Sequence, residues 1–132
     1  MLLALLLAQG ADSIPLIDFR SINAAAERYV TCSVNGVGPM LKSNLSAEAI
    51  ADDAMHQCSK DADFLFVETR RTFESTAPPR VELDAAGQVE LDAAIARASR
   101  KEKDIIRSNI VSWIKKARSQ DKGSQPSHPR QS

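Results

Sequence analysis

The chain has 132 residues, and its 17 Lys and Arg balance its 17 Asp and Glu to give a formal net charge of zero. Hydrophobic residues make up 43% of the chain and charged residues 26%, which excludes a disordered or fibrous protein and is typical of a globular one. This length suits one compact domain and is too short for two. Because aromatic residues make up only 5%, the core must be built mainly from Ala, Leu, Ile and Val.

The chain starts with an apolar run, LLALLLA at residues 2–8, which is followed by small residues up to Ala11. An apolar stretch followed by small residues is typical of a signal peptide, so we expect residues 1–11 to be removed on export to the periplasm or the medium. The run is much shorter than the ~20 apolar residues that cross a bilayer, so no transmembrane segment is expected in the mature chain.

No Lys or Arg precedes this run, although export signals normally begin with positive charge. The alternative is therefore a cytoplasmic helical protein in which the apolar N-terminus is part of the fold. With the signal peptide removed, residues 12–119 are expected to form a single small helical domain.

The first helix is predicted over residues 18–34, because Ile22, Ala25, Tyr29 and Cys32 recur at the spacing of one helical face. It ends at the sequence NGVGP, since glycine and proline disfavour a continuing helix.

The second helix is predicted to start after Ser46, a preferred N-cap residue, and to run to about residue 73. Its apolar face is expected to be buried and consists of Ala47, Ile50, Ala51, Ala54, Met55, Cys58, Ala62, Leu65, Phe66, Thr69 and Phe73. Pro78 and Pro79 break the chain beyond it. Residues 81–84 then alternate like a short strand that has no partner strand.

The third helix is predicted over residues 88–118. Its apolar positions are Leu91, Ile95, Ala98, Ile105, Ile106, Ile110, Trp113, Ile114 and Ala117. Residues 97–104 are polar on almost every side and are expected to face solvent, and residues 120–132 contain no apolar residue and are expected to be a disordered tail.

Cys32 and Cys58 are the only cysteines, and an even pair in an exported chain predicts a disulfide. They lie equally far from the start of the second helix, so they face each other in an antiparallel hairpin. Two free thiols are one alternative. A metal or ligand site that uses Met55, His56 and the thiols is another, although His56 points away from Cys58 on a helix. The predicted fold is therefore all-α: a disulfide-linked antiparallel helical hairpin plus a long C-terminal amphipathic helix.

Charge is distributed unevenly along the chain. Residues 1–96 carry seven basic and 14 acidic residues, whereas residues 97–132 carry ten basic and three acidic ones. In one interpretation the basic helix packs on the acidic first two helices. In the other it binds an acidic protein or an anionic membrane surface, through Arg107, Trp113, Lys115, Lys116 and Arg118. No recognition motif favours nucleic acid.

No catalytic constellation is complete. His128 lies in the predicted tail, which leaves His56 as the candidate base, and a disulfide leaves no thiolate. Carboxylates at helical spacing, such as Glu48 and Asp52, are typical of a solvated acidic face. We therefore expect a non-enzymatic interaction protein without a metal or cofactor; the alternatives are the metal or ligand binder and the cytoplasmic protein described above.

Overall fold

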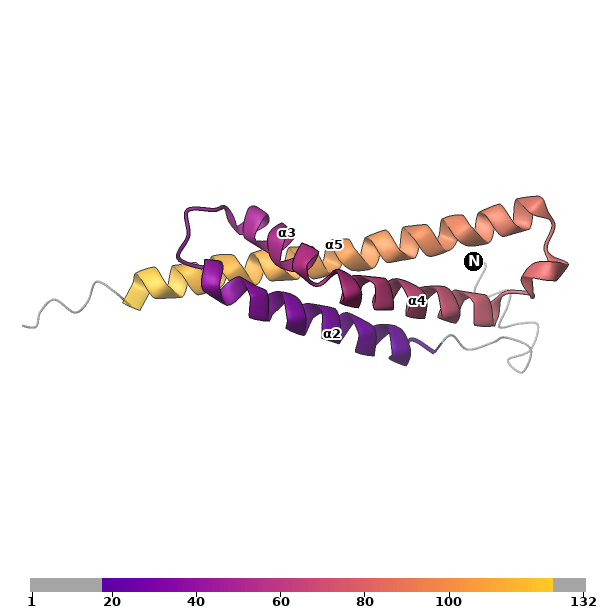
Figure 1. Cartoon of the computed structure of the whole chain (residues 1–132), viewed down its shortest axis with the longest axis horizontal. Helices are drawn as coiled ribbons and strands as arrows, with labels where there is room; N and C mark the ends of the chain where they lie inside the picture. Colours follow the sequence, from indigo (N-terminus) through magenta and orange to yellow (C-terminus); the bar gives the residue numbers. More distant parts are fainter. Residues whose placement is uncertain (1–17, 125–132) are drawn as a thin grey trace, which may run out of the picture.

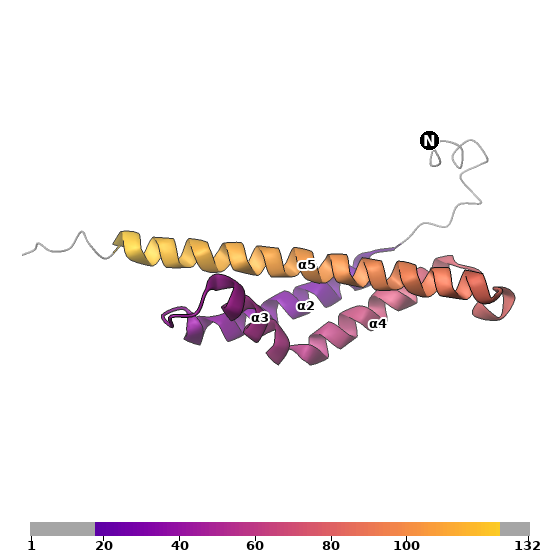
Figure 2. The same cartoon turned by 90° about the horizontal axis from the view of Figure 1, so that it is seen from above.

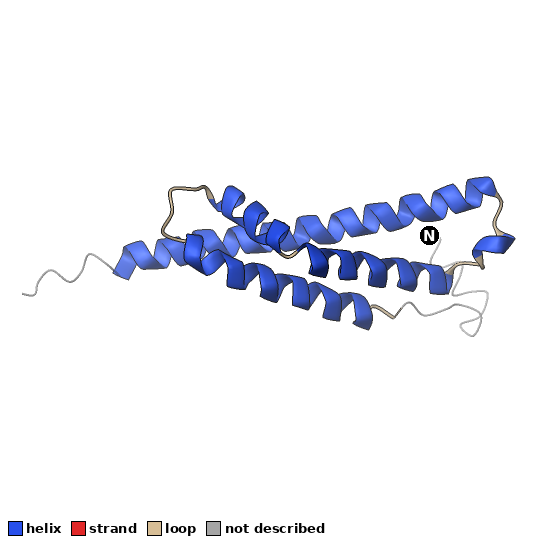
Figure 3. Ribbon diagram, viewed as in Figure 1, coloured by secondary structure: helices blue, strands red, loops and turns tan. Residues whose placement is uncertain are grey.

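The computed structural model describes residues 18–124, and these residues form helices without any strand (Figures 1 and 3). The elements in chain order are α2 (Arg20–Val37), the 3₁₀ helix η2 (Gly38–Met40), α3 (Ala47–Gln57), α4 (Ser59–Thr76), the 3₁₀ helix η3 (Arg80–Glu82) and α5 (Ala85–Ser124). The predicted all-α fold is confirmed. The predicted signal peptide and residues 125–132 of the predicted tail lie outside the described residues.

The helices form an elongated bundle in which α5 runs along the other three. α2 and α4 are antiparallel, since Cys32 is bonded to Cys58 and the hydroxyl oxygens of Ser21 and Thr72 lie 3.5 Å apart. In Figure 2, α5 forms one side of the molecule, and α2, α3 and α4 all lie on the other. One long side of α5 is therefore left uncovered by the described helices.

A single apolar cluster holds α2, α3, α4 and the second half of α5 together. Its largest fully buried members include Ile50, Leu65, Ile110 and Ile114, each at most 2% exposed. Burying one such aliphatic side chain contributes roughly 1.5–3 kcal/mol, which makes this cluster the main source of stability for the bundle.

The predicted second helix is two helices, and the prediction of a continuous one is wrong. Its start is confirmed, because Ala49 N–H donates to the Ser46 side chain at 3.0 Å. The helix breaks at Cys58, whose N–H bonds to Met55 O in a tighter turn. No glycine or proline marks this break; it falls on the residue that is bonded to α2.

The long helix is longer than predicted at both ends. The segment 81–84, which alternates like a strand, overlaps η3 and leads directly into α5, which begins at Ala85 and ends at Ser124. The first residues of the predicted tail, 120–124, therefore belong to α5.

Three apolar side chains expected on buried faces are exposed. Phe66 is 41%, Ile105 47% and Trp113 42% exposed. Each lies at the edge of the apolar face of its helix. The residue next to it in the chain (Leu65, Ile106 or Ile114) fills the core instead.

Candidate functional site

Arg107 and Lys115, two of the residues predicted to bind a partner, bind α3. Arg107 donates from Nε to Asp52 Oδ1 at 2.6 Å and from Nη2 to Oδ2 at 3.2 Å. Lys115 Nζ lies 3.3 Å from Glu48 Oε2. The Arg107 guanidinium holds the pKa of Asp52 below its usual value. The pKa of Glu48 is lowered first by a backbone N–H and then by Lys115.

Arg118, a third predicted partner-binding residue, also bonds within the chain. Its guanidinium donates to Leu41 O at 3.0 Å and to Ser43 O at 3.1 Å. It therefore fixes the connection between η2 and α3 against the last turns of α5, because two backbone carbonyls of this connection accept hydrogen bonds from it.

Trp113 and Lys116, the other two predicted residues, are exposed. Lys116 has no ion-pair partner among residues 18–124. The structure thus divides the predicted set: three cations are used internally, whereas Trp113 and Lys116 remain on the surface.

A second group of cations on α5, which sequence reasoning did not assign to a site, is free of such contacts. Arg97, Arg100 and Lys101 are all exposed, line one shallow hollow, and have no ion-pair partner in the described part of the chain. We call them the basic cluster. Asp104 lines the same hollow. The sequence feature that points to this cluster is the polar run at 97–104, which predicts that these residues face solvent.

The basic cluster continues into a row of exposed side chains. Arg97, Lys101, Ile105, Asn109 and Trp113 are exposed and follow one another at steps of four residues. Residues at this spacing form a ridge along an α-helix. We call this row the exposed ridge. Two cations form one end of it, Ile105 lies in the middle and Trp113 forms the other end.

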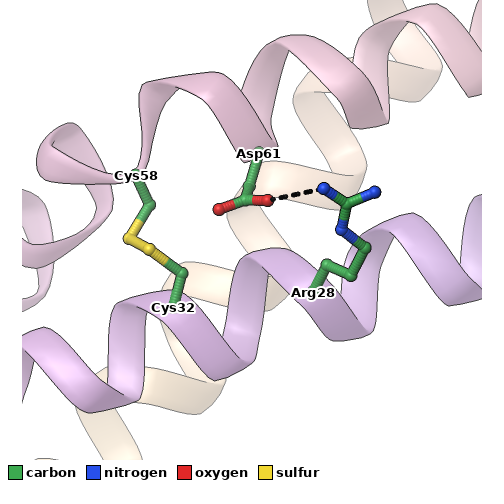
Figure 4. Close-up of a disulfide and its surroundings, with 4 residues drawn as sticks. All are labelled: Arg28, Cys32, Cys58 and Asp61. Atoms are coloured by element: carbon green, nitrogen blue, oxygen red, sulfur yellow. Dashed lines mark ion pairs between the residues drawn. A yellow bond between two sulfur atoms is a disulfide. The ribbon is translucent and has the colours of Figure 1, made fainter.

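The cysteines form the predicted disulfide, with the two Cα atoms 6.1 Å apart. Cys58 is buried and Cys32 is half-buried. Figure 4 shows the Asp61 carboxylate beside the two sulfur atoms, together with Arg28, whose Nη2 lies 3.6 Å from Asp61 Oδ1. The Arg28 guanidinium also stacks 4.4 Å from the centroid of the Phe64 ring.

The alternative site built from Met55, His56 and the thiols is not assembled. Met55 is buried in the apolar cluster, and His56 is exposed on α3. The structure instead gathers Cys32, Cys58 and Asp61, whose potential ligand atoms all lie within 4.8 Å of one another.

The carboxylates at helical spacing on α3 are used in side-chain contacts. Glu48 and Asp52 pair with α5, and Asp53 accepts a hydrogen bond from Gln57 Nε2 at 2.9 Å. The lowered pKa values of Glu48 and Asp52 suit groups that stay charged and join α3 to α5.

None of the described helices is long and apolar enough to cross a bilayer. No known protein family matches the chain, and neither a curated protein nor a solved structure does.

Proposed function

We propose that this chain is an exported, non-enzymatic binding module that docks the exposed ridge of α5 on an anionic membrane surface. One observation carries the proposal. Among residues 18–124, Arg97, Arg100 and Lys101 are exposed and unpaired on the longest helix, whereas Arg107, Lys115 and Arg118 are already engaged. Like charges one turn apart repel each other, so an anionic partner would stabilise this face.

The form of the ridge favours a membrane over an acidic protein. The exposed ridge runs from Arg97 to Trp113 and is therefore about 24 Å long, on a helix that extends along the other three (Figure 2). Ile105 and Trp113 provide apolar anchors on the ridge, and tryptophan prefers the interface between water and lipid. Each Lys or Arg near an anionic membrane contributes about 1 kcal/mol to binding.

The disulfide supports export, since such bonds persist in oxidising compartments. Together with the apolar run at 2–8, it favours the periplasm or the medium over the cytoplasm. The pairing of Glu48 and Asp52 with α5 supports a structural role for these carboxylates and thus a non-enzymatic protein.

The test is sedimentation with vesicles of phosphatidylethanolamine and phosphatidylglycerol. The double variant Arg97→Glu and Lys101→Glu should bind at least tenfold more weakly than the unchanged chain, because two attractive charges become repulsive. Trp113 is the only tryptophan, so a blue shift of its fluorescence on binding reports whether this end of the ridge enters the interface.

The matched control is the double variant Lys42→Glu and Lys60→Glu, which changes the net charge equally but leaves α5 intact. Its affinity for the anionic vesicles should lie within about twofold of that of the unchanged chain. Vesicles of phosphatidylcholine alone should bind neither the unchanged chain nor this control variant. Equal losses in both double variants would contradict the proposal. Binding to soluble polyglutamate but not to the anionic vesicles would instead favour an acidic protein partner.

A further inference from the structure

The Asp61 carboxylate lies beside the disulfide that joins α2 to α4. Asp61 lies one turn beyond Cys58 on α4, and one of its oxygens points toward the sulfur atoms in Figure 4. Its side chain is only 21% exposed, and no hydrogen bond to it is found among the described residues. Its cationic neighbour, Arg28, lies 3.6 Å from the other oxygen.

We propose that in the reduced chain Cys32, Cys58 and Asp61 bind a zinc ion. The ligand set is two thiolates and one carboxylate, with a water molecule in the fourth position, which is a combination of donors that suits Zn²⁺. This proposal is independent of membrane docking and uses none of the α5 residues.

The step from disulfide to metal site is balanced as follows. A dithiol reductant passes two electrons and two protons to the Cys32–Cys58 bond and becomes a disulfide itself. Zn²⁺ then displaces the two thiol protons as both sulfurs become ligands. The disulfide and the zinc ion therefore exclude each other.

The fold keeps the three ligands together without the covalent bond. Cys58 belongs to the apolar cluster and Cys32 packs against it, so core packing between α2 and α4 fixes both sulfurs. Cys32 and Asp61 also line a hollow that is open to solvent, together with Arg28 and Asn35. An ion can reach the site from this side.

The experiment uses the full chain after reduction and anaerobic removal of the reductant. Co²⁺, which replaces Zn²⁺ in such sites, should bind one per chain with the absorption of a tetrahedral thiolate complex, and Zn²⁺ should displace it. The oxidised chain should bind neither ion at this site. Circular dichroism of the reduced chain should retain the helical signal, or recover it when zinc is added.

The matched variants are Asp61→Asn and Asp63→Asn, two changes of the same kind on α4, of which only the first removes a ligand. Asp61→Asn should weaken Co²⁺ binding at least tenfold, whereas Asp63→Asn should leave it unchanged. Absence of the thiolate band in the reduced chain would overturn the proposal. An unchanged Co²⁺ affinity of Asp61→Asn would overturn it as well. So would a chain that loses its helical signal on reduction and does not recover it when zinc is added.

Discussion

Ser33 is a polar residue of α2 that is buried without a hydrogen-bond partner for its hydroxyl group in residues 18–124. Its hydroxyl oxygen is buried and has no hydrogen-bond partner among the described residues. A hydroxyl in this state has lost its contact with water and gains nothing in return, which costs roughly 1–3 kcal/mol. Ser33 lies between Tyr29 and Val37 at steps of four residues, and all three are buried on the inner face of α2.

We predict that Ser33→Ala stabilises the protein by about 1 kcal/mol, because it removes the unsatisfied hydroxyl and improves helix propensity. The free energy of unfolding from urea titration measures this. Ser112→Ala, at an exposed position of α5, is the control and should gain only the propensity part, about 0.5 kcal/mol. A loss of stability in Ser33→Ala would show that the hydroxyl is bonded after all.

The cations of α5 show the limit of reasoning from single residues. Arg97 and Arg107 are the same residue type on the same helix. Arg107 forms two hydrogen bonds to Asp52, whereas Arg97 forms no side-chain hydrogen bond among residues 18–124. Which arginine is free depends on what α3 places opposite it. The sequence therefore predicted a basic helix, and only the tertiary structure decided which of its cations form contacts within the chain.

At the scale of elements, the buried apolar face of α5 is narrower than the number of apolar residues in the helix suggests. Ile105 and Ile106 are adjacent and identical in type, yet they are 47% and 3% exposed. Only one of the two can face the bundle, since neighbouring residues on a helix point about 100° apart.

We predict that Ile106→Ala destabilises the protein by about 3 kcal/mol, because it leaves a cavity in the apolar cluster. Ile105→Ala should cost about 1 kcal/mol or less, and it should weaken binding to anionic vesicles by removing an anchor from the exposed ridge. Urea titration and vesicle sedimentation of the same two variants measure both effects. Equal destabilisation by the two changes would contradict the orientation of α5.

The break at Cys58 is the other feature that belongs to this scale. Helix propensity and apolar periodicity continue through residues 46–73, so the local sequence gives no reason to stop. α3 and α4 both pack on α2 and α5, and the break between them falls on the residue that the disulfide joins to α2. Tertiary contacts outweigh a propensity difference of less than about 1 kcal/mol per residue.

At the scale of the whole molecule, opposite charges join α5 to the rest. Arg107 pairs with Asp52, Lys115 with Glu48, and Arg80 with both Glu74 and Asp92 across the turn between α4 and α5. Hydrogen bonds from Arg80 lower the pKa of Glu74 and of Asp92, and the Arg107 contact lowers that of Asp52. A backbone N–H and then Lys115 lower the pKa of Glu48. Part of the excess positive charge of residues 97–132 is thus neutralised by ion pairs with the acidic part of the chain.

We predict that stability falls when the pH is lowered below about 4, the usual carboxyl pKa. These carboxyl groups have lower pKa values in the folded chain, so the unfolded chain binds more protons there, and their contribution is lost as the pH passes through the folded pKa values. Above pH 5 they should contribute no further pH dependence. Urea midpoints at pH 7, 5 and 3 measure this.

Asp52→Asn is the control for the pH dependence, and it should flatten the fall between pH 5 and pH 3 because one of the shifted carboxyl groups is absent. Salt should reduce the fall as well, since these pairs lie at the surface. A midpoint that rises as the pH falls from 5 to 3 would exclude stabilising pairs of this kind.

The sequence by itself determined the features that depend on local order. Apolar residues at helical spacing fixed the helical class, Ser46 fixed the start of α3, and the spacing of Cys32 and Cys58 fixed the disulfide. Each follows from residues close in the chain or from the symmetry of one hairpin.

Only the tertiary structure decided the break at Cys58, the orientation of Ile105 and Trp113, and which cations remain unpaired. It also brought Asp61 to the sulfur atoms. The physical reason is the same in each case: the free energy of a side chain depends on what a distant element places beside it. A helical period of 3.6 residues leaves positions at the edge of a stripe undecided until the bundle closes around them.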